Sequence, residues 1–192
     1  MMKRAAVFFA TGFEEVEALT TVDLLRRAGI ETVCVSTDNS RTVTGSHQIT
    51  VEMNAGIDDL DCGSFDILIL PGGMPGTKNL EACAQLTEAI RSFYGSGGHI
   101  AAICAAPGVF ARMGLLRGKQ ACIYPGMEDE LLQNGADACC DRSVVKSGTI
   151  ITSRGVGTAI DFALEIVAAL LDRETANGLG ESVVHPVTEQ KF

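Results

Sequence analysis

The sequence predicts an α/β domain with a mostly parallel central sheet that is covered by helices on both faces. Short apolar runs alternate with amphipathic segments along the chain, and this rhythm is typical of repeated strand–helix pairs. The 192 residues suit one domain, and 46% apolar content is enough for a sizeable core. No repeat, linker or low-complexity segment divides the chain, so a single domain over residues 1–192 is expected.

The N-terminal half is expected to supply the first strands and one amphipathic helix. Val16, Leu19 and Leu24 can share one helix face, and Gly29 is a suitable C-cap. The apolar start is interpreted as a strand and not as a signal peptide, because acidic residues follow where a cleavage site should be. The predicted elements are, in order, a strand over 3–10, a helix over 14–28, a strand over 30–36, a hairpin within 42–53 and a strand over 66–70.

The C-terminal half continues the alternation. Pro107 fits the first turn of a helix, where its missing N–H group costs nothing. The predicted elements are a helix over 86–94, a strand over 99–103, a helix over 105–113, a short helix over 127–134, paired strands at 143–145 and 149–152, a long apolar helix over 158–171 and a final short helix from 174.

Charge, hydropathy and cysteine spacing argue against several classes of protein. The net charge of −9 disfavours nucleic acid as a partner, and no apolar stretch approaches the ~20 residues of a membrane helix. The seven cysteines include no CxxC pair and no accompanying zinc-type histidine pattern, so no metal site is expected. Most of these cysteines are interpreted as small buried hydrophobes in a reducing, cytoplasmic setting.

Candidate functional residues gather after three predicted strands. In a doubly wound sheet the carboxyl ends of the strands form the ligand edge. Cys104 stands between a strand and a helix, among small neighbours, as in a nucleophile elbow, and a helix N-terminus lowers the pKa of a thiol. The alternative is that Cys104 is only a small core residue. The residues expected at this edge are Glu14, Glu15, Glu17, Gly72, Gly73 and Cys104.

The three acidic residues fall in the first turn of a predicted helix. Glu14 and Glu17 lie on one side of it and Glu15 on another, so one of them can point back at the strand ends. The alternative is a solvated first turn, where the helix dipole favours acids.

No histidine obviously completes a catalytic triad. His99 lies about 16 Å from Cys104 along the same strand. His185 is expected at the surface, and His47 is expected to reach the site only across a subunit boundary.

Five motifs, in order along the chain, resemble the DJ-1/ThiJ/PfpI superfamily and fall closest to its DJ-1/ThiJ branch. The resemblance runs from the first strand to about Leu171, nearly the whole chain. The motifs are Gly12-Phe13-Glu14-Glu15-Val16-Glu17, Asp23-Leu24-Leu25-Arg26-Arg27-Ala28-Gly29, Leu70-Pro71-Gly72-Gly73, Ala101-Ala102-Ile103-Cys104-Ala105-Ala106-Pro107 and Thr152-Ser153-Arg154-Gly155-Val156-Gly157-Thr158.

The resemblance implies a flavodoxin-like three-layer αβα sandwich and a homodimer with its interface beside the active sites. It makes Cys104 the nucleophile and Glu17 a protonated carboxyl group hydrogen-bonded to the sulfur. The N–H groups of Gly73 and Ala105 would form an oxyanion hole, with Gly72 in a supporting role. Asp23 and Arg27 match family positions near the dimer interface and the site.

Three positions depart from the family pattern. Tyr124, ahead of Pro125, stands where many relatives have a histidine, and a tyrosine with a pKa of about 10 is a poor base near neutral pH. His47 stands where the close branch often has an arginine, and it is a candidate imidazole supplied in trans. Val156 replaces a proline common in the Gly-x-Gly turn.

The leading hypothesis is a cofactor-independent, cysteine-dependent enzyme with a stress-protective role. Its substrates would be small reactive carbonyls or glycated groups, as in glyoxalases and deglycases. The first alternative is a redox-sensing or chaperone-like stress protein without turnover, since thiolates of low pKa oxidise readily. The second is an amidase or protease of the PfpI type, which Tyr124 disfavours because peptide cleavage needs a proton donor for the amine.

Overall fold

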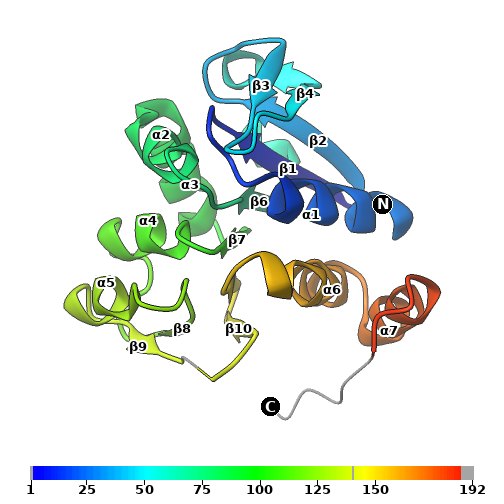
Figure 1. Cartoon of the computed structure of the whole chain (residues 1–192). Coiled ribbons are helices and arrows are strands. Elements are labelled where there is room, and N and C mark those ends of the chain that lie inside the picture. The colour runs from blue at the N-terminus through cyan, green and yellow to red at the C-terminus, as the bar shows by residue number, and fades with distance from the viewer. Residues whose placement is uncertain (1, 140, 187–192) are drawn as a thin grey trace.

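A seven-stranded sheet runs through the middle of the molecule, shown in Figure 1 as a computed structural model that describes residues 2–139 and 141–186. Its strands are β1 (Arg4–Phe9), β2 (Glu31–Ser36), β5 (Ala55–Gly56), β6 (Ile67–Leu70), β7 (His99–Ile103), β10 (Val144–Ser147) and β11 (Ile150–Ser153). The order across the sheet is β10-β11-β7-β6-β1-β2-β5. Every neighbouring pair is parallel except β10 with β11.

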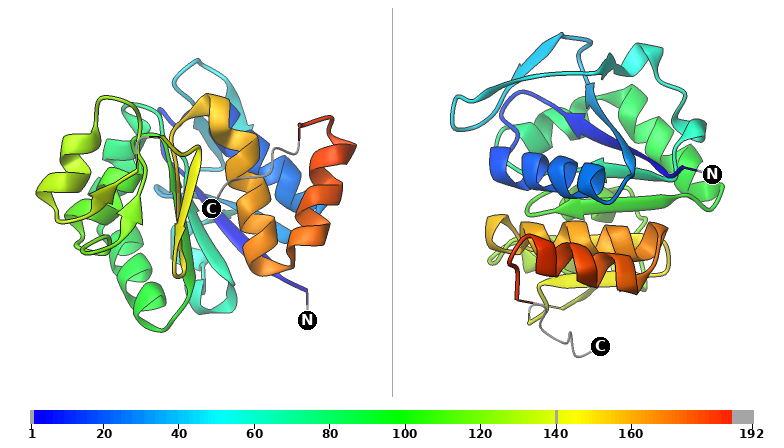
Figure 2. Two further views of the ribbon diagram at one scale, coloured as in Figure 1. Left: turned by 90° about the horizontal axis from the view of Figure 1, so that it is seen from below. Right: turned by 90° about the vertical axis from the view of Figure 1, so that its right-hand side faces the viewer.

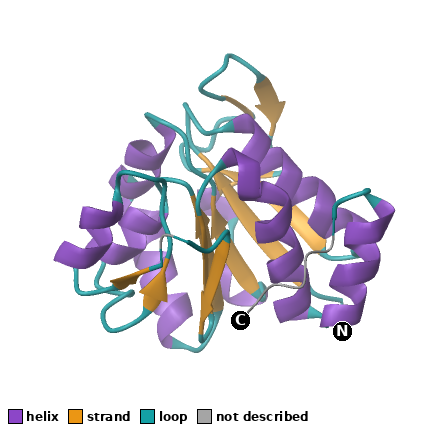
Figure 3. Ribbon diagram, turned by 60° about the horizontal axis from the view of Figure 1, so that its bottom comes forward, coloured by secondary structure: helices purple, strands orange, loops and turns teal. Residues whose placement is uncertain are grey.

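Helices cover both faces of this sheet, as the two views of Figure 2 and the colours of Figure 3 show. One face carries α1 (Glu15–Arg27), α6 (Ala159–Leu170) and α7 (Arg173–Ser182), and the other carries α2 (Gly76–Ala82), α3 (Ala84–Gly95), α4 (Pro107–Arg112) and α5 (Glu128–Gln133). Along β1, Ala6 and Phe8 point into one core and Val7 and Phe9 into the other. The predicted three-layer, flavodoxin-like architecture is confirmed.

Two small strand pairs lie outside the central sheet. The hairpin of β3 (Thr42–Thr44) and β4 (Thr50–Glu52) is antiparallel, as predicted. It is fastened to the turn before α1 by backbone hydrogen bonds from Gly12 to Thr44, at 2.8 Å, and from Ser46 to Phe13, at 2.8 Å. The second pair joins β8 (Gln120–Ala121) to β9 (Asp137–Ala138). Because the turn before α1 follows the carboxyl end of β1, these hydrogen bonds place the β3–β4 hairpin at the carboxyl edge of the central sheet.

The predicted strands and helices agree with the structure to within a few residues at each end. The elements missing from the prediction are α2, β5, β8 and β9, together with the 3-10 turns η1 (Ile57–Asp59), η2 (Cys62–Ser64) and η3 (Val156–Thr158). The first turn of α2 follows a Pro- and Gly-rich stretch that indicates a loop, and the other elements are too short to show a period. None of the helices in the described part of the chain is long and apolar enough to cross a membrane.

Candidate active site

The carboxyl ends of β1, β6 and β7 bring three turns together at one edge of the sheet. The turn after β1 leads into α1, the turn after β6 holds Gly72 and Gly73, and the turn after β7 holds Cys104. A depression of about 520 Å³ opens there, and Cys104, Glu17 and His47 are among its lining residues. The ligand edge expected from the strand order therefore carries a cavity.

Cys104 occupies a strained backbone position. Its φ is 65°, in the left-handed region that costs a non-glycine residue about 1–2 kcal/mol. Two backbone hydrogen bonds fix this conformation: the Cys104 N–H donates to the Ser153 carbonyl at 3.0 Å, and the Tyr124 N–H donates to the Cys104 carbonyl at 2.9 Å. The helix α4 then starts at Pro107. The chain thus forms a sharp strand–turn–helix bend that leaves the thiol partly exposed at the cavity.

Gly72 makes room for this bend. A methyl group on Gly72 would lie 2.5 Å from Cys104 Cβ and 2.6 Å from Glu17 Oε2, both well inside van der Waals contact. Its N–H donates to Glu17 Oε2 at 2.9 Å. Only glycine allows the two side chains to approach this backbone so closely.

Glu17 is fully buried, and its two oxygens have different surroundings. Oε2 accepts the Gly72 hydrogen bond, whereas Oε1 has no conventional hydrogen-bond partner within the described ranges. Burial raises the pKa of Glu17 to about 7, against smaller opposing effects of the Cys104 thiol and the Gly72 N–H. A buried carboxyl group with a free oxygen and a raised pKa is suited to carry a proton near neutral pH.

The Cys104 thiol and the Glu17 carboxyl group titrate as a pair. Burial and the negative charge of Glu17 raise the pKa of Cys104 to about 12, while the N–H groups of Ala105 and Gly73 beside the sulfur act in the opposite direction. The expected lowering of the thiol pKa by the helix N-terminus is therefore wrong while Glu17 is ionised, because burial and like charge outweigh it. The pair as a whole loses one proton near pH 7 and the second near pH 12.

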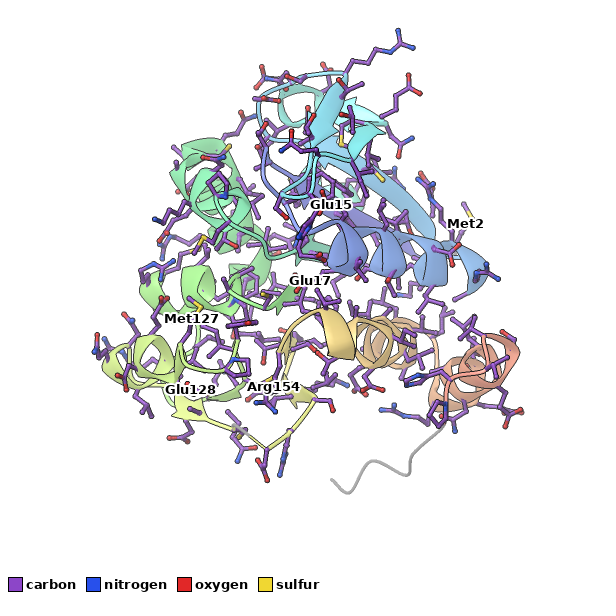
Figure 4. All side chains as sticks on the ribbon, viewed as in Figure 1. Met2, Glu15, Glu17, Met127, Glu128 and Arg154 are labelled. Carbon is purple, nitrogen blue, oxygen red and sulfur yellow. The ribbon has the colours of Figure 1, made fainter. Side chains whose placement is uncertain are left out.

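The first turn of α1 is not the solvated acidic turn offered as the alternative. Glu14, Glu15 and Glu17 are 8%, 3% and 0% exposed. Glu14 caps the helix by accepting the Glu17 N–H at 2.7 Å. Glu15 and Glu17 leave α1 on opposite sides, as Figure 4 shows, with Glu17 directed at the strand ends. The three acids therefore have three distinct surroundings.

His47 reaches the cavity from the same chain, so the expectation that it could do so only across a subunit boundary is wrong. It lies in the turn between β3 and β4 and lines the depression with Cys104. Its Nδ1 lies 2.8 Å from Glu15 Oε2, and its backbone N–H donates to Glu15 Oε1 at 2.6 Å. The prediction failed because it did not anticipate that the hairpin folds back onto the first turn of α1.

Asp23 and Arg27 do not line the cavity of their own chain, and their expected place near a dimer interface stays a prediction. They form an exposed ion pair at 2.7 Å and line a different depression, between α1, α6 and the end of α7. Asp23 follows Glu17 by six residues, which is about 9 Å along the helix axis. His185, expected at the surface, is partly buried and lies 2.8 Å from Asp161.

Two further side chains line the cavity. Tyr124 is half-exposed, and its backbone, not its ring, holds the Cys104 turn. Arg154 follows β11, and its guanidinium makes no hydrogen bond or ion pair with any other described residue. Arg154 was not predicted as a site residue, although it falls in the fifth motif and its place after a strand at the same edge was a usable signal.

Fewer of the described cysteines are fully buried than expected. Cys34 and Cys122 are buried, whereas Cys62, Cys83, Cys104 and Cys139 are partly exposed. Cys140 lies outside the described residues.

In the described ranges, the one group of side chains with metal-ligand spacing is Glu14, Glu15 and His47, whose ligand atoms lie within 4.8 Å of one another. The Glu15 oxygens already accept hydrogen bonds from His47, from Ser46 Oγ at 3.3 Å and from the Ile49 N–H at 3.5 Å. This carboxylate is thus fully engaged without a metal ion.

The structure places a cysteine on a strained turn at the carboxyl edge of a flavodoxin-like sheet, with a buried carboxyl group beside it. This arrangement defines a class of α/β proteins with a cysteine-centred site. The DJ-1/PfpI family model matches residues 3–169, and the chain belongs to that family. Protein dj-1beta of Drosophila melanogaster is 36% identical over 184 residues, which cover 96% of this chain and 98% of the relative. Its crystal structure has a TM-score of 0.92 to this one, over 96% of this chain and 99% of that chain.

Two other relatives carry informative descriptions. A Caenorhabditis elegans protein named glutathione-independent glyoxalase DJR-1.2 is 35% identical over 166 residues, or 86% of this chain and 87% of the relative. A structure of Toxoplasma gondii DJ-1, described as oxidized, has a TM-score of 0.90 with 32% identity and covers 96% of this chain and 99% of that chain.

Proposed function

We propose that this protein is a cysteine-dependent enzyme that converts small 2-oxoaldehydes to 2-hydroxy acids without an organic cofactor. The observation that carries the proposal is the Cys104–Glu17 pair: both side chains line the same cavity, and the Glu17 carboxyl group is fully buried beside the sulfur. The Caenorhabditis relative named as a glyoxalase supports the same class of reaction.

The chemistry starts with charge on sulfur. When the shared proton sits on Glu17 Oε1, the neutral acid donates to the Cys104 thiolate and no longer repels it. The thiolate attacks the aldehyde carbon of a substrate such as methylglyoxal, a carbon–sulfur bond forms, and the carbonyl oxygen becomes an oxyanion. The N–H groups of Gly73 and Ala105, which lie beside the sulfur, are suited to stabilise that oxyanion, and Glu17 protonates it to give a hemithioacetal.

The hemithioacetal then becomes a product by proton transfers and hydrolysis alone. The proton on C1 moves to C2, the C1 hydroxyl loses its proton and the C2 oxygen gains one, which yields a 2-hydroxy thioester. C1 is oxidised and C2 is reduced by two electrons each, so no external oxidant takes part. Water cleaves the thioester, releases the 2-hydroxy acid and restores the thiol. The same addition to glycated thiols or amines is the deglycase form of the proposal.

The test is the conversion of methylglyoxal to lactate by the purified protein and by Cys104→Ala. We expect the parent to form lactate after treatment with a chelator, and we expect Cys104→Ala to form none. Equal rates for the two proteins would remove Cys104 from the reaction. Loss of the parent rate on chelation, restored by a divalent cation, would contradict a metal-independent mechanism.

A redox role is the second candidate, because a thiolate beside a neutral carboxyl group is set up for oxidation to a sulfinate that Glu17 can hold by a hydrogen bond. The oxidized Toxoplasma relative supports it. Mild peroxide should then add oxygen to Cys104 in intact-protein mass spectra, and an unmodified Cys104 would remove this candidate. An amidase or protease role has less support, since the tyrosine at position 124 is a weak proton donor for an amine.

The proposal also includes a homodimer in the cytoplasm, as the family resemblance and the cysteine content suggest. Light scattering of the purified protein tests the dimer, and a monomer at micromolar concentration would contradict it.

A further inference from the structure

The proposed reaction leaves one proton transfer without an assigned residue. The proton that moves from C1 to C2 needs a base on the carbon side of the hemithioacetal, whereas Glu17 lies against the sulfur and the Gly72 N–H. Tyr124 also lines this cavity, but a phenol is a weaker base than an imidazole near neutral pH.

His47 is the imidazole that the fold brings to this cavity. It lies in the β3–β4 turn, its side chain is 70% exposed in the single chain, and it lines the same depression as Cys104. No other described histidine lines that depression. The ring is therefore accessible to a bound substrate.

Glu15 fixes the orientation of this ring. Its carboxylate is buried and lies 2.8 Å from His47 Nδ1, and it also accepts the His47 backbone N–H at 2.6 Å. A carboxylate accepts hydrogen bonds only, so Nδ1 carries a hydrogen and Nε2 is the nitrogen left to exchange protons. In hydrolases, a buried carboxylate accepts a hydrogen bond from one ring nitrogen of a histidine base, and the other ring nitrogen takes and returns the proton.

The geometry points to His47 as the catalytic base that moves the C1 proton to C2, with Glu15 as its positioning residue. This inference rests on the proposed function. His47 Nε2 takes the proton from C1 of the hemithioacetal, the electrons of the broken C–H bond form the C1–C2 double bond, and the C2 carbonyl electrons move to the C2 oxygen, which gives an enediolate. The C1 hydroxyl proton passes to the C2 oxygen, the carbonyl re-forms at C1, and the electrons of the double bond take the proton from His47 Nε2 at C2. The ring ends neutral and the proton count is unchanged.

The charges around the ring set the direction of the pH dependence. Hydrogen bonding and attraction to Glu15, with a smaller contribution from Glu14, raise the pKa of His47 above its ordinary value. A base must be deprotonated to act, so kcat should rise with pH through this raised pKa. The titratable and charged groups that contact the ring or share its depression are Glu14, Glu15, Glu17, Cys104, Tyr124 and Arg154.

The test compares lactate formation by the parent, His47→Ala, Glu15→Gln and the control His185→Ala. His185 makes a similar contact with Asp161, at 2.8 Å, away from the cavity. We expect His47→Ala to lower kcat by on the order of 100-fold or more, the usual size of general base catalysis. External imidazole should restore much of this rate, and methylglyoxal should still form its adduct with Cys104 in mass spectra. His185→Ala should match the parent.

Glu15→Gln should move the acidic limb of the kcat profile to lower pH, because it removes the charge that raises the pKa of His47. If this variant fails to fold, His47→Ala still decides the question, since the His47 side chain is exposed. A parent that forms lactate while His47→Ala is equally fast overturns this inference alone. So does a slow His47→Ala that imidazole does not rescue, because that result indicates a structural role. A parent that forms no lactate overturns the proposed function and this inference together.

Discussion

Replacing Glu17 with glutamine separates the two ways in which the Cys104–Glu17 pair can hold its single charge. The pair loses its protons near pH 7 and near pH 12. If the charge between these values sits on sulfur, most of Cys104 is thiolate at pH 8. If the charge sits on Glu17, the thiol keeps its pKa of about 12 and about one molecule in ten thousand is reactive at pH 8.

The Glu17→Gln substitution shifts the pKa of the Cys104 thiol in opposite directions in the two cases. Removing a Glu17 carboxylate would relieve repulsion and lower the pKa of Cys104. Removing a Glu17 carboxylic acid replaces a strong hydrogen-bond donor to the thiolate with a weaker amide donor. This loss raises the pKa of Cys104. Our mechanism predicts the second outcome, so the midpoint of Cys104 reactivity should lie at higher pH in Glu17→Gln than in the parent.

The assay is the rate of iodoacetamide alkylation of Cys104 against pH, followed by peptide mass spectrometry. Cys62 serves as an internal control in both proteins, because burial and Asp61 raise its pKa independently of Glu17. A Cys104 midpoint that falls in Glu17→Gln, or a parent thiol that stays unreactive below about pH 10, would refute the assignment of the proton to Glu17.

Three further predictions concern stability. The native state holds the Glu17 proton between the ordinary pKa of 4.5 and about 7, so the free energy of unfolding should fall by about 3 kcal/mol as pH rises through this window. Urea denaturation at a series of pH values should show this fall in the parent but not in Glu17→Gln. The same dependence of the free energy of unfolding on pH in both proteins would contradict the prediction. Gly72→Ala should destabilise the protein by about 1–3 kcal/mol through overpacking against Cys104, and it should slow Cys104 alkylation. Gly157→Ala, at the same cavity with open space around it, should change stability by less than about 0.5 kcal/mol, and similar losses in the two variants would argue against the steric explanation. Cys104→Gly should have a higher melting temperature than Cys104→Ala, and its free energy of unfolding should be larger by about 1 kcal/mol, because only glycine is relaxed at φ 65°. The reverse order of melting temperatures would show that the turn is not strained.

The elements that position the site could be predicted because their sequence signals are local. Continuous apolar runs indicate β6 and β7, and small residues followed by Pro107 indicate the turn at Cys104. A side chain's neighbours across the cavity depend instead on how loops pack. Glu15 shows the difference, since an acid in the first turn of a helix normally faces water, and here a hairpin more than 30 residues later buries it.

The electrostatics of the site could not be predicted from residue types alone. A helix start after Cys104 suggests a thiol of low pKa, but α4 has only six residues, and burial beside Glu17 reverses the sign. The position of Asp23 and Arg27 was inferred from family resemblance, and the direction of α1 carries both away from the cavity.

The backbone N–H of Tyr124 has a consequence for how this family can diversify. It holds the Cys104 carbonyl at 2.9 Å, and any residue except proline supplies the same donor. The half-exposed Tyr124 ring therefore takes no part in holding the Cys104 turn. Position 124 can exchange histidine for tyrosine without loosening the bend that carries the thiol, so mutation can sample new proton donors there while the architecture stays intact.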